Sequence, residues 1–131
     1  MSVFVDTSAF YAFLAIDDKH HPGAVEAFAS IAGERRLTHS YVLVETEALV
    51  RARLGVAASN RLHLDLWPAF EVRWVDERLH RSGVAALLAA GRRDLSLVDC
   101  VSFELMRVEQ LDVALTFDGD FAAAGFQTIP G

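Results

Sequence analysis

The chain has 131 residues, which corresponds to one domain spanning residues 1–131 and large enough to bury a substantial hydrophobic core. Its 53% hydrophobic and 23% charged residues exclude a disordered or coiled-coil protein, and no apolar stretch is long enough to cross a bilayer. The formal net charge of -6 argues against nucleic-acid binding through a basic surface, unless several of the carboxylates bind metal.

The first half of the chain predicts two short strands, each followed by helices. Apolar residues recur at helical spacing after each strand, and Gly33 and Gly55 fall at predicted helix ends. Ser40 is a candidate N-cap for the longest of these helices. In chain order we expect a strand at 3–5, a helix at 8–16, a helix from 21 or 22 to 32, a strand at 36–39 and a helix from 40 to about 54.

The second half continues the alternation of helices and strands. We expect a helix at 56–66, a strand at 70–75, a helix at 76–90, a helix beginning at Ser96, a strand at 113–116, a turn or short helix, and a strand at 126–129. Strands separated by helices predict a mainly parallel, twisted sheet covered on both faces, which is a three-layer α/β/α domain. Trp67 and Trp74 are expected to pack in the core.

Four short acidic motifs stand out. Each places a carboxylate within or just after an apolar run, where an isolated charge is costly, so convergence on a cation is the economical explanation. In open α/β sheets, ligands bind outside the carboxyl ends of the strands, where strand order reverses. The motifs are Val-Phe-Val-Asp-Thr-Ser at Asp6, Val-Leu-Val-Glu-Thr-Glu at Glu45, Leu-Ser-Leu-Val-Asp at Asp99 and Leu-Thr-Phe-Asp-Gly-Asp at Asp118.

Each carboxylate also has a purely structural alternative. Asp6 could serve only as a helix N-cap, and Asp99 could complete a capping box with Ser96. The helical spacing around Glu45 does not distinguish it cleanly from Glu47 as the inward-facing residue.

The last motif is ambiguous within itself. Asp118 and Asp120 flank Gly119, and Asp and Gly are common in surface turns for conformational reasons alone. Their relative roles therefore stay open at this point.

Other reactive residues favour no competing chemistry. The histidines lack the paired spacing of a zinc site, and Cys100 is expected to be a small buried hydrophobe. A single cysteine also suits a reducing cytoplasm. Lys19 is the only lysine and lies far from any late strand end, which disfavours a phosphoacceptor receiver or a dehalogenase-type phosphatase.

Taken together and in this order, the four motifs resemble those of PIN-domain ribonucleases, and specifically the VapC toxins of bacterial and archaeal toxin-antitoxin pairs. The resemblance spans nearly the whole chain. Carried over by position, it implies an acidic quartet, a possible fifth member and two polar supports. These are Asp6, Glu45, Asp99 and Asp118, then Asp120, then Ser8 and Thr116.

The resemblance implies an endoribonuclease that depends on Mg²⁺ or Mn²⁺ and acts as the toxin of a type II pair. Asp6 and Asp99 would make the central metal contacts, Asp118 would complete the site, and Glu45 would bind or polarise the attacking water. It further implies an RNA substrate, a cognate antitoxin and a homodimer in the cytoplasm. The alternatives are a PIN-like module that binds RNA or protein without cleaving it, and a housekeeping nuclease without an antitoxin.

RNA affinity would then depend on the metal and on local arginines, because the net charge is negative. Eleven of the twelve basic residues are arginine. The candidates for RNA contacts are Arg51, Arg53, Arg92 and Arg93.

Overall fold

The computed structural model describes all residues, 1–131, and contains a single five-stranded sheet. Every neighbouring pair of strands is parallel, and the strand order is β3-β2-β1-β4-β5. The strands are β1 (Ser2–Val5), β2 (Arg35–His39), β3 (Glu71–Arg73), β4 (Val113–Leu115) and β5 (Gln127–Ile129).

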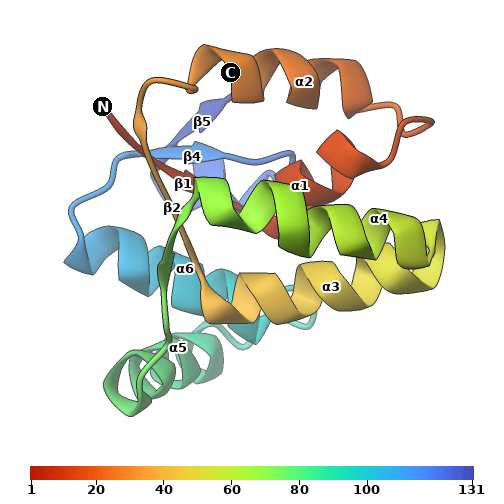
Figure 1. Cartoon of the computed structure of the whole chain (residues 1–131). Helices are drawn as coiled ribbons and strands as arrows, with labels where there is room; N and C mark the ends of the chain where they lie inside the picture. The colour runs from red at the N-terminus through yellow and green to blue at the C-terminus, as the bar shows by residue number, and fades with distance from the viewer.

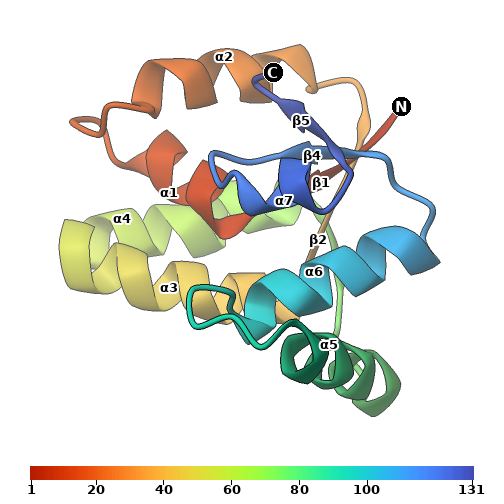
Figure 2. The same cartoon turned by 180° about the vertical axis from the view of Figure 1, so that it is seen from behind.

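Helices lie on both sides of this sheet, so the predicted three-layer α/β/α fold is confirmed. In Figures 1 and 2, α2 lies above the sheet and α5 and α6 lie below it. No helix of the structure is long and apolar enough to span a membrane. The α-helices are α1 (Thr7–Leu14), α2 (His21–Ser30), α3 (Ser40–Leu54), α4 (Val56–Arg61), α5 (Glu77–Ala90), α6 (Leu97–Val108) and α7 (Asp120–Ala123).

The strand order reverses beside β1. The chain moves from β1 to β2 and β3 in one direction, then passes through α5 and α6 to β4 on the other side of β1. Because all five strands are parallel, their carboxyl ends lie at one edge, and β1 and β4 flank the point of reversal. Asp6 follows β1 directly, and Asp118 lies three residues beyond β4.

The core is built around the central strands. Val3, Phe4 and Val5 of β1 are fully buried, as expected for a strand that is covered on both faces. The ring of Phe4 stacks on Phe121, with centroids 6.0 Å apart, and this contact packs α7 against the sheet.

The helix predicted at 56–66 is shorter and less regular than expected. α4 ends at Arg61, a π-helical turn follows at Leu62–Leu66, and a 3₁₀ turn covers Trp67–Ala69. Pro68 has no N–H to donate and restricts the residue before it, so a regular α-helix cannot continue through this segment.

The prediction that Ser40 caps the long helix is wrong. The cap is His39, whose Nδ1 accepts hydrogen bonds from the backbone N–H groups of Tyr41 (3.2 Å) and Val42 (3.3 Å). Ser40 instead accepts a hydrogen bond at its Oγ from the N–H of Val75, at 2.8 Å. A buried imidazole can replace the usual hydroxyl cap because burial lowers the pKa of His39 to about 3 and keeps it neutral.

The prediction for the tryptophans is half right. Trp67 is buried and packs edge-on against Phe10, with ring centroids 4.6 Å apart. Trp74 is 75% exposed, because it lies just beyond β3, the edge strand, where nothing covers it. Cys100 is buried, as predicted.

Candidate active site

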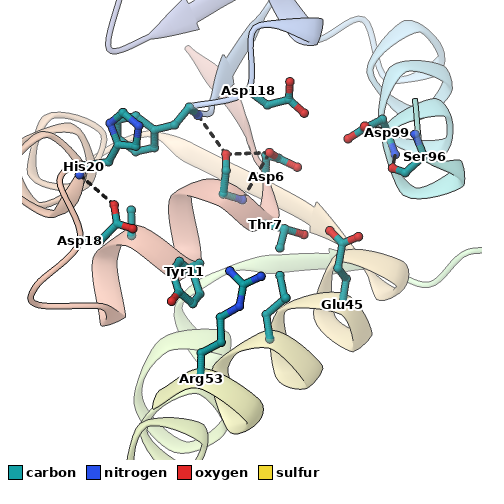
Figure 3. Close-up of a pocket in the computed structure, with 14 residues that line it drawn as sticks. Asp6, Thr7, Tyr11, Asp18, His20, Glu45, Arg53, Ser96, Asp99 and Asp118 are labelled. Carbon is teal, nitrogen blue, oxygen red and sulfur yellow. Dashed lines mark hydrogen bonds between the residues drawn. The ribbon is translucent and has the colours of Figure 1, made fainter. Parts of the chain in front are cut away.

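A cleft of about 420 Å³ opens at the carboxyl edge of the sheet, and the four predicted carboxylates all line it. Figure 3 shows them converging from four separate segments. Asp6 follows β1, Glu45 lies on α3, Asp99 lies in the first turn of α6, and Asp118 follows β4. The topology thus gathers side chains that are up to 112 positions apart in the sequence (118 minus 6).

Asp6 is both a helix cap and a cleft residue, so the two alternatives left open by the sequence are compatible. It is the N-cap of α1, and its Oδ2 accepts a hydrogen bond from the backbone N–H of Ser8 at 3.4 Å. The same Oδ2 accepts from the hydroxyls of Ser8 (2.8 Å) and Thr116 (3.1 Å). These three bonds fix the carboxylate in one orientation.

Ser8 and Thr116 also connect Asp6 to the loop that carries Asp118. Phe117 donates its N–H to Ser8 Oγ at 2.9 Å, and Asp118 donates its N–H to Thr116 Oγ1 at 3.0 Å. The two hydroxyls lie 3.2 Å apart. They therefore tie the end of β1 to the end of β4. Ser8 also lines the cleft, whereas Thr116 does not.

Burial destabilises the charged forms of Asp6 and Asp99, and repulsion between carboxylates adds to this effect at Asp99. Burial raises the pKa of Asp6 to about 6, against the opposing effect of its hydrogen bonds. The pKa of Asp99 rises to about 7, first because of burial and then because Asp6 and Asp118 are negative neighbours. A bound cation would relieve both effects.

Glu45, rather than Glu47, faces the cleft. Glu45 lines it without forming a salt bridge, whereas Glu47 lies on another face of α3. The Glu47 carboxylate accepts hydrogen bonds from Ser59 (2.8 Å) and Arg51 (3.1 Å), and His63 lies 3.2 Å from it. The sequence could not separate these two residues, because the partners of Glu47 come from the following turns.

Asp99 also combines two roles. It forms the predicted capping box: its N–H donates to Ser96 Oγ at 3.0 Å, and its carboxylate accepts from the Ser96 N–H at 3.5 Å. This geometry holds the carboxylate at the start of α6, where it also lines the cleft.

Asp118 and Asp120 have different surroundings, although each offers a carboxylate oxygen to the same acidic group. Asp118 lines the cleft, while Asp120 begins α7 and accepts a hydrogen bond from Arg92 at 3.0 Å. The Asp120 N–H donates to Asp118 Oδ1 at 2.9 Å. Asp120 therefore orients Asp118 through its backbone, while its own charge is balanced by an arginine.

The donor set fits a hard divalent cation. One carboxylate oxygen from each of Asp99, Asp118 and Asp120 lies within 4.8 Å of the other two, and Asp6 lines the same cleft. Carboxylate oxygens are the preferred protein ligands of Mg²⁺ and Mn²⁺. The buried hydroxyl of Thr7, next to Asp6, also lines the cleft and has no hydrogen-bond partner within the protein, so its oxygen is available to a bound group.

The cleft extends past the acidic quartet to three residues outside the four motifs and to Phe117 from the last motif. Tyr11, Asp18, His20 and Phe117 line this second part, and the rings of His20 and Phe117 stack with centroids 4.6 Å apart. The five histidines lack the spacing of metal ligands, so the sequence did not mark His20 as a cleft residue. Asp18 and His20 lie in the loop that leads from α1 to α2. That position in the sequence was the feature that could have indicated a place near the cleft.

Comparison with known proteins identifies the family. The family model described as the PIN domain matches residues 3–127, which is nearly the whole chain. The chain belongs to the PIN-domain family. The resemblance inferred from the four motifs is thereby confirmed at the level of the family.

The comparisons also include a curated relative with a named activity. The chain is 35% identical over 125 residues to the "23S rRNA-specific endonuclease VapC20" of Mycobacterium tuberculosis, and the match covers 95% of each protein. The crystal structure of VapC20, described as a sarcin-ricin loop cleaving toxin, superposes with a TM-score of 0.86 at 34% identity, again over 95% of each chain. The predicted resemblance to a VapC toxin is therefore confirmed as well.

More distant structures share the fold. FitAcB from Neisseria gonorrhoeae matches with a TM-score of 0.71 at 18% identity, covering 96% of this chain and 95% of the other. VapBC2 from Rickettsia felis, solved bound to a DNA fragment from its promoter, also gives 0.71, at 14% identity and 98% and 97% coverage. At these identities the likeness concerns the fold alone.

Proposed function

We propose that this PIN-domain protein is an endoribonuclease that depends on Mg²⁺ or Mn²⁺ and acts as the toxin of a toxin-antitoxin pair. One observation carries the proposal: Asp6, Glu45, Asp99 and Asp118 line one cleft at the point where strand order reverses. Carboxylates that share a site repel one another, as Asp6 and Asp118 do when they raise the pKa of Asp99, so such a cluster is costly unless it binds a cation.

Asp6, Asp99 and Asp118 would hold the metal. When bound, a divalent cation activates water for attack on a phosphodiester and neutralises charge on the phosphate. The unpaired Glu45 lies on the opposite wall of the cleft, on α3, and would orient the attacking water as a hydrogen-bond acceptor. Ser8 and Thr116 would act indirectly, by keeping Asp6 in one orientation.

For the substrate, we propose ribosomal RNA of the large subunit. VapC20 is named for activity on 23S rRNA, and it aligns with this chain over 95% of both proteins. The sarcin-ricin loop, the target in the description of the VapC20 structure, is therefore the first site to examine.

The remaining features follow the toxin assignment. We expect a cognate antitoxin that binds this chain, a homodimer and a cytoplasmic location, where the RNA is available. Copurification with the product of a neighbouring small gene and a molar mass measured in solution would test the first two.

The direct test is cleavage of purified ribosomes and total RNA, with the cut sites mapped by primer extension. The wild-type protein should cut with Mg²⁺ or Mn²⁺ and not with EDTA. Asp6→Asn and Asp99→Asn keep the size of each side chain but should lower the cleavage rate at least about 100-fold.

Folded wild-type protein that cuts no RNA with either metal would contradict the nuclease assignment and favour a non-catalytic binding module. Cleavage of RNA without growth arrest on expression would instead favour a housekeeping nuclease. Cutting that survives both substitutions would overturn the proposed site.

A further inference from the structure

Arg53 is the one arginine or lysine among the residues that line the cleft. Five carboxylates line the cleft, the quartet together with Asp18, against this single guanidinium. A bound metal ion offsets negative charge only close to its own site. The phosphates of an RNA strand on either side of the scissile one would therefore be repelled by the remaining carboxylates of the cleft. Arg53 is the cleft residue able to counter that repulsion.

The other arginine candidates are engaged elsewhere or lie outside the cleft. Arg51 pairs with Glu47 at 3.1 Å, and Arg92 pairs with Asp94 (3.1 Å) and Asp120 (3.0 Å). Arg93 does not line the cleft. Arg53 lines it and forms no salt bridge, although several carboxylates share the same cavity.

Arg53 is held in place by an aromatic ring. Its guanidinium carbon lies 5.5 Å from the ring centroid of Tyr11, a cation–π distance. Figure 3 shows the guanidinium turned from α3 toward Thr7, beside Tyr11. Such a contact leaves the N–H donors in the plane of the guanidinium available to a ligand.

The position of Arg53 on α3 determines how far it lies from the acidic quartet. Glu45, Leu49 and Arg53 line the cleft at intervals of four residues, so they form one stripe along α3. Eight residues of helix rise about 12 Å between the Cα atoms of Glu45 and Arg53. Because helical side chains lean toward the N-terminus, Arg53 reaches back toward the quartet.

We propose that Arg53 binds a backbone phosphate of the RNA next to the scissile one and so positions the strand in the cleft. A planar guanidinium with free donors fits a phosphate in bidentate fashion. The assignment rests on the proposed nuclease function. It makes Arg53 a residue for substrate binding, separate from the groups that would hold metal.

The test compares Arg53→Ala with Arg51→Ala, a matched control two positions away on the same helix. Both side chains are exposed, so both variants should fold. The probe is a fluorescent single-stranded RNA of mixed sequence, with binding measured in a protein that also carries Asp99→Asn so that the RNA stays intact. Arg53→Ala should weaken binding about 5- to 50-fold, whereas Arg51→Ala should change it less than about twofold.

Two further readouts distinguish a phosphate contact from a structural role. The slope of log affinity against log salt should fall by about 0.7 in Arg53→Ala, the value for one phosphate contact on a single strand. In cleavage assays without the Asp99 substitution, Arg53→Ala should raise KM more than it lowers kcat. Arg53→Lys should recover part of the affinity, since it restores the charge but not the bidentate geometry.

Equal RNA affinity in the two alanine variants, or a loss with an unchanged salt slope, would overturn the assignment of Arg53. That result differs from a failure of the proposed function. The proposed function fails instead if the folded wild-type protein cuts no RNA with Mg²⁺ or Mn²⁺, whatever the relative affinities of the two alanine variants.

Discussion

The charged residues on two faces of helix α3 differ in whether they have partners within the protein. On the outer face, Glu47 is balanced by Arg51, Ser59 and His63. On the cleft face, Glu45 and Arg53 line the same cavity without a salt bridge to any residue. The two faces belong to one helix and carry the same residue types.

The difference separates charges that serve the fold from charges that await a ligand. A carboxylate with its own arginine and hydroxyl gains stability within the protein and has less to offer an ion or substrate. A carboxylate without such partners keeps its lone pairs available, and clusters of such groups mark functional sites. The carboxyl edge of the sheet repeats the contrast, where Asp118 lines the cleft and Asp120 pairs with Arg92.

The largest expected effect comes from replacing one of the two glutamates of α3, Glu45 or Glu47, by glutamine in separate variants. Glu45→Gln should lower the cleavage rate about 100- to 1,000-fold, because the amide is a poorer acceptor for the attacking water. Glu47→Gln should leave the rate within about threefold and lower the free energy of unfolding by about 1 kcal/mol. Single-turnover cleavage and urea denaturation of both variants measure these effects. Similar cleavage rates in the two variants would contradict the different roles of Glu45 and Glu47.

The second test applies the same contrast to the loop after β4. Asp118→Asn should reduce cleavage about 100-fold, since it removes a carboxylate from the cleft. Asp120→Asn should cost about tenfold or less, because its charge is already balanced by Arg92 and its backbone N–H still orients Asp118. A larger loss in Asp120→Asn, measured at several Mn²⁺ concentrations, would show that Asp120 is itself a ligand.

The last test concerns the pH dependence of stability without divalent ions, which reports on the cleft carboxylates but not on the cleavage rate. Asp6 and Asp99 have ordinary pKa values of 3.8, which burial and neighbouring charge raise to about 6 and about 7 in the folded protein. The folded state thus holds protons that the unfolded chain has released, so stability should fall as pH rises from about 4 to about 7. The pKa shift of Asp6 alone corresponds to a loss on the order of 3 kcal/mol.

Urea denaturation in EDTA at pH 5 to 8 measures this slope, and Asp6→Asn should reduce it. His39 acts in the opposite direction, because its pKa falls from 6.5 to about 3 on folding, so its contribution is lost as pH decreases. The comparison between wild type and Asp6→Asn cancels that term. Added Mg²⁺ should stabilise the wild type more at pH 8 than at pH 5, and equal stabilisation would contradict a carboxylate metal site.

The sequence by itself determined the architecture, because local patterns carry that information. Val3, Phe4 and Val5 form an uninterrupted run of β-branched and aromatic residues that is typical of a strand buried on both faces, and all three are fully buried. Ser96 and Asp99 have the spacing of a capping box, and that box is present. These features depend on residues within a few positions of one another, so they can be read without knowledge of the fold.

Contacts between distant segments were decided only by the tertiary structure. Glu45 could not be chosen over Glu47 until Ser59 and His63 folded against one side of α3, and Asp120 was distinguished from Asp118 by Arg92 in a separate loop. The cap of α3 was misassigned for the same reason, since His39 is kept neutral by burial that no neighbouring residue in the sequence reveals. The sequence supplied the charges, and packing decided which of them were left without a partner.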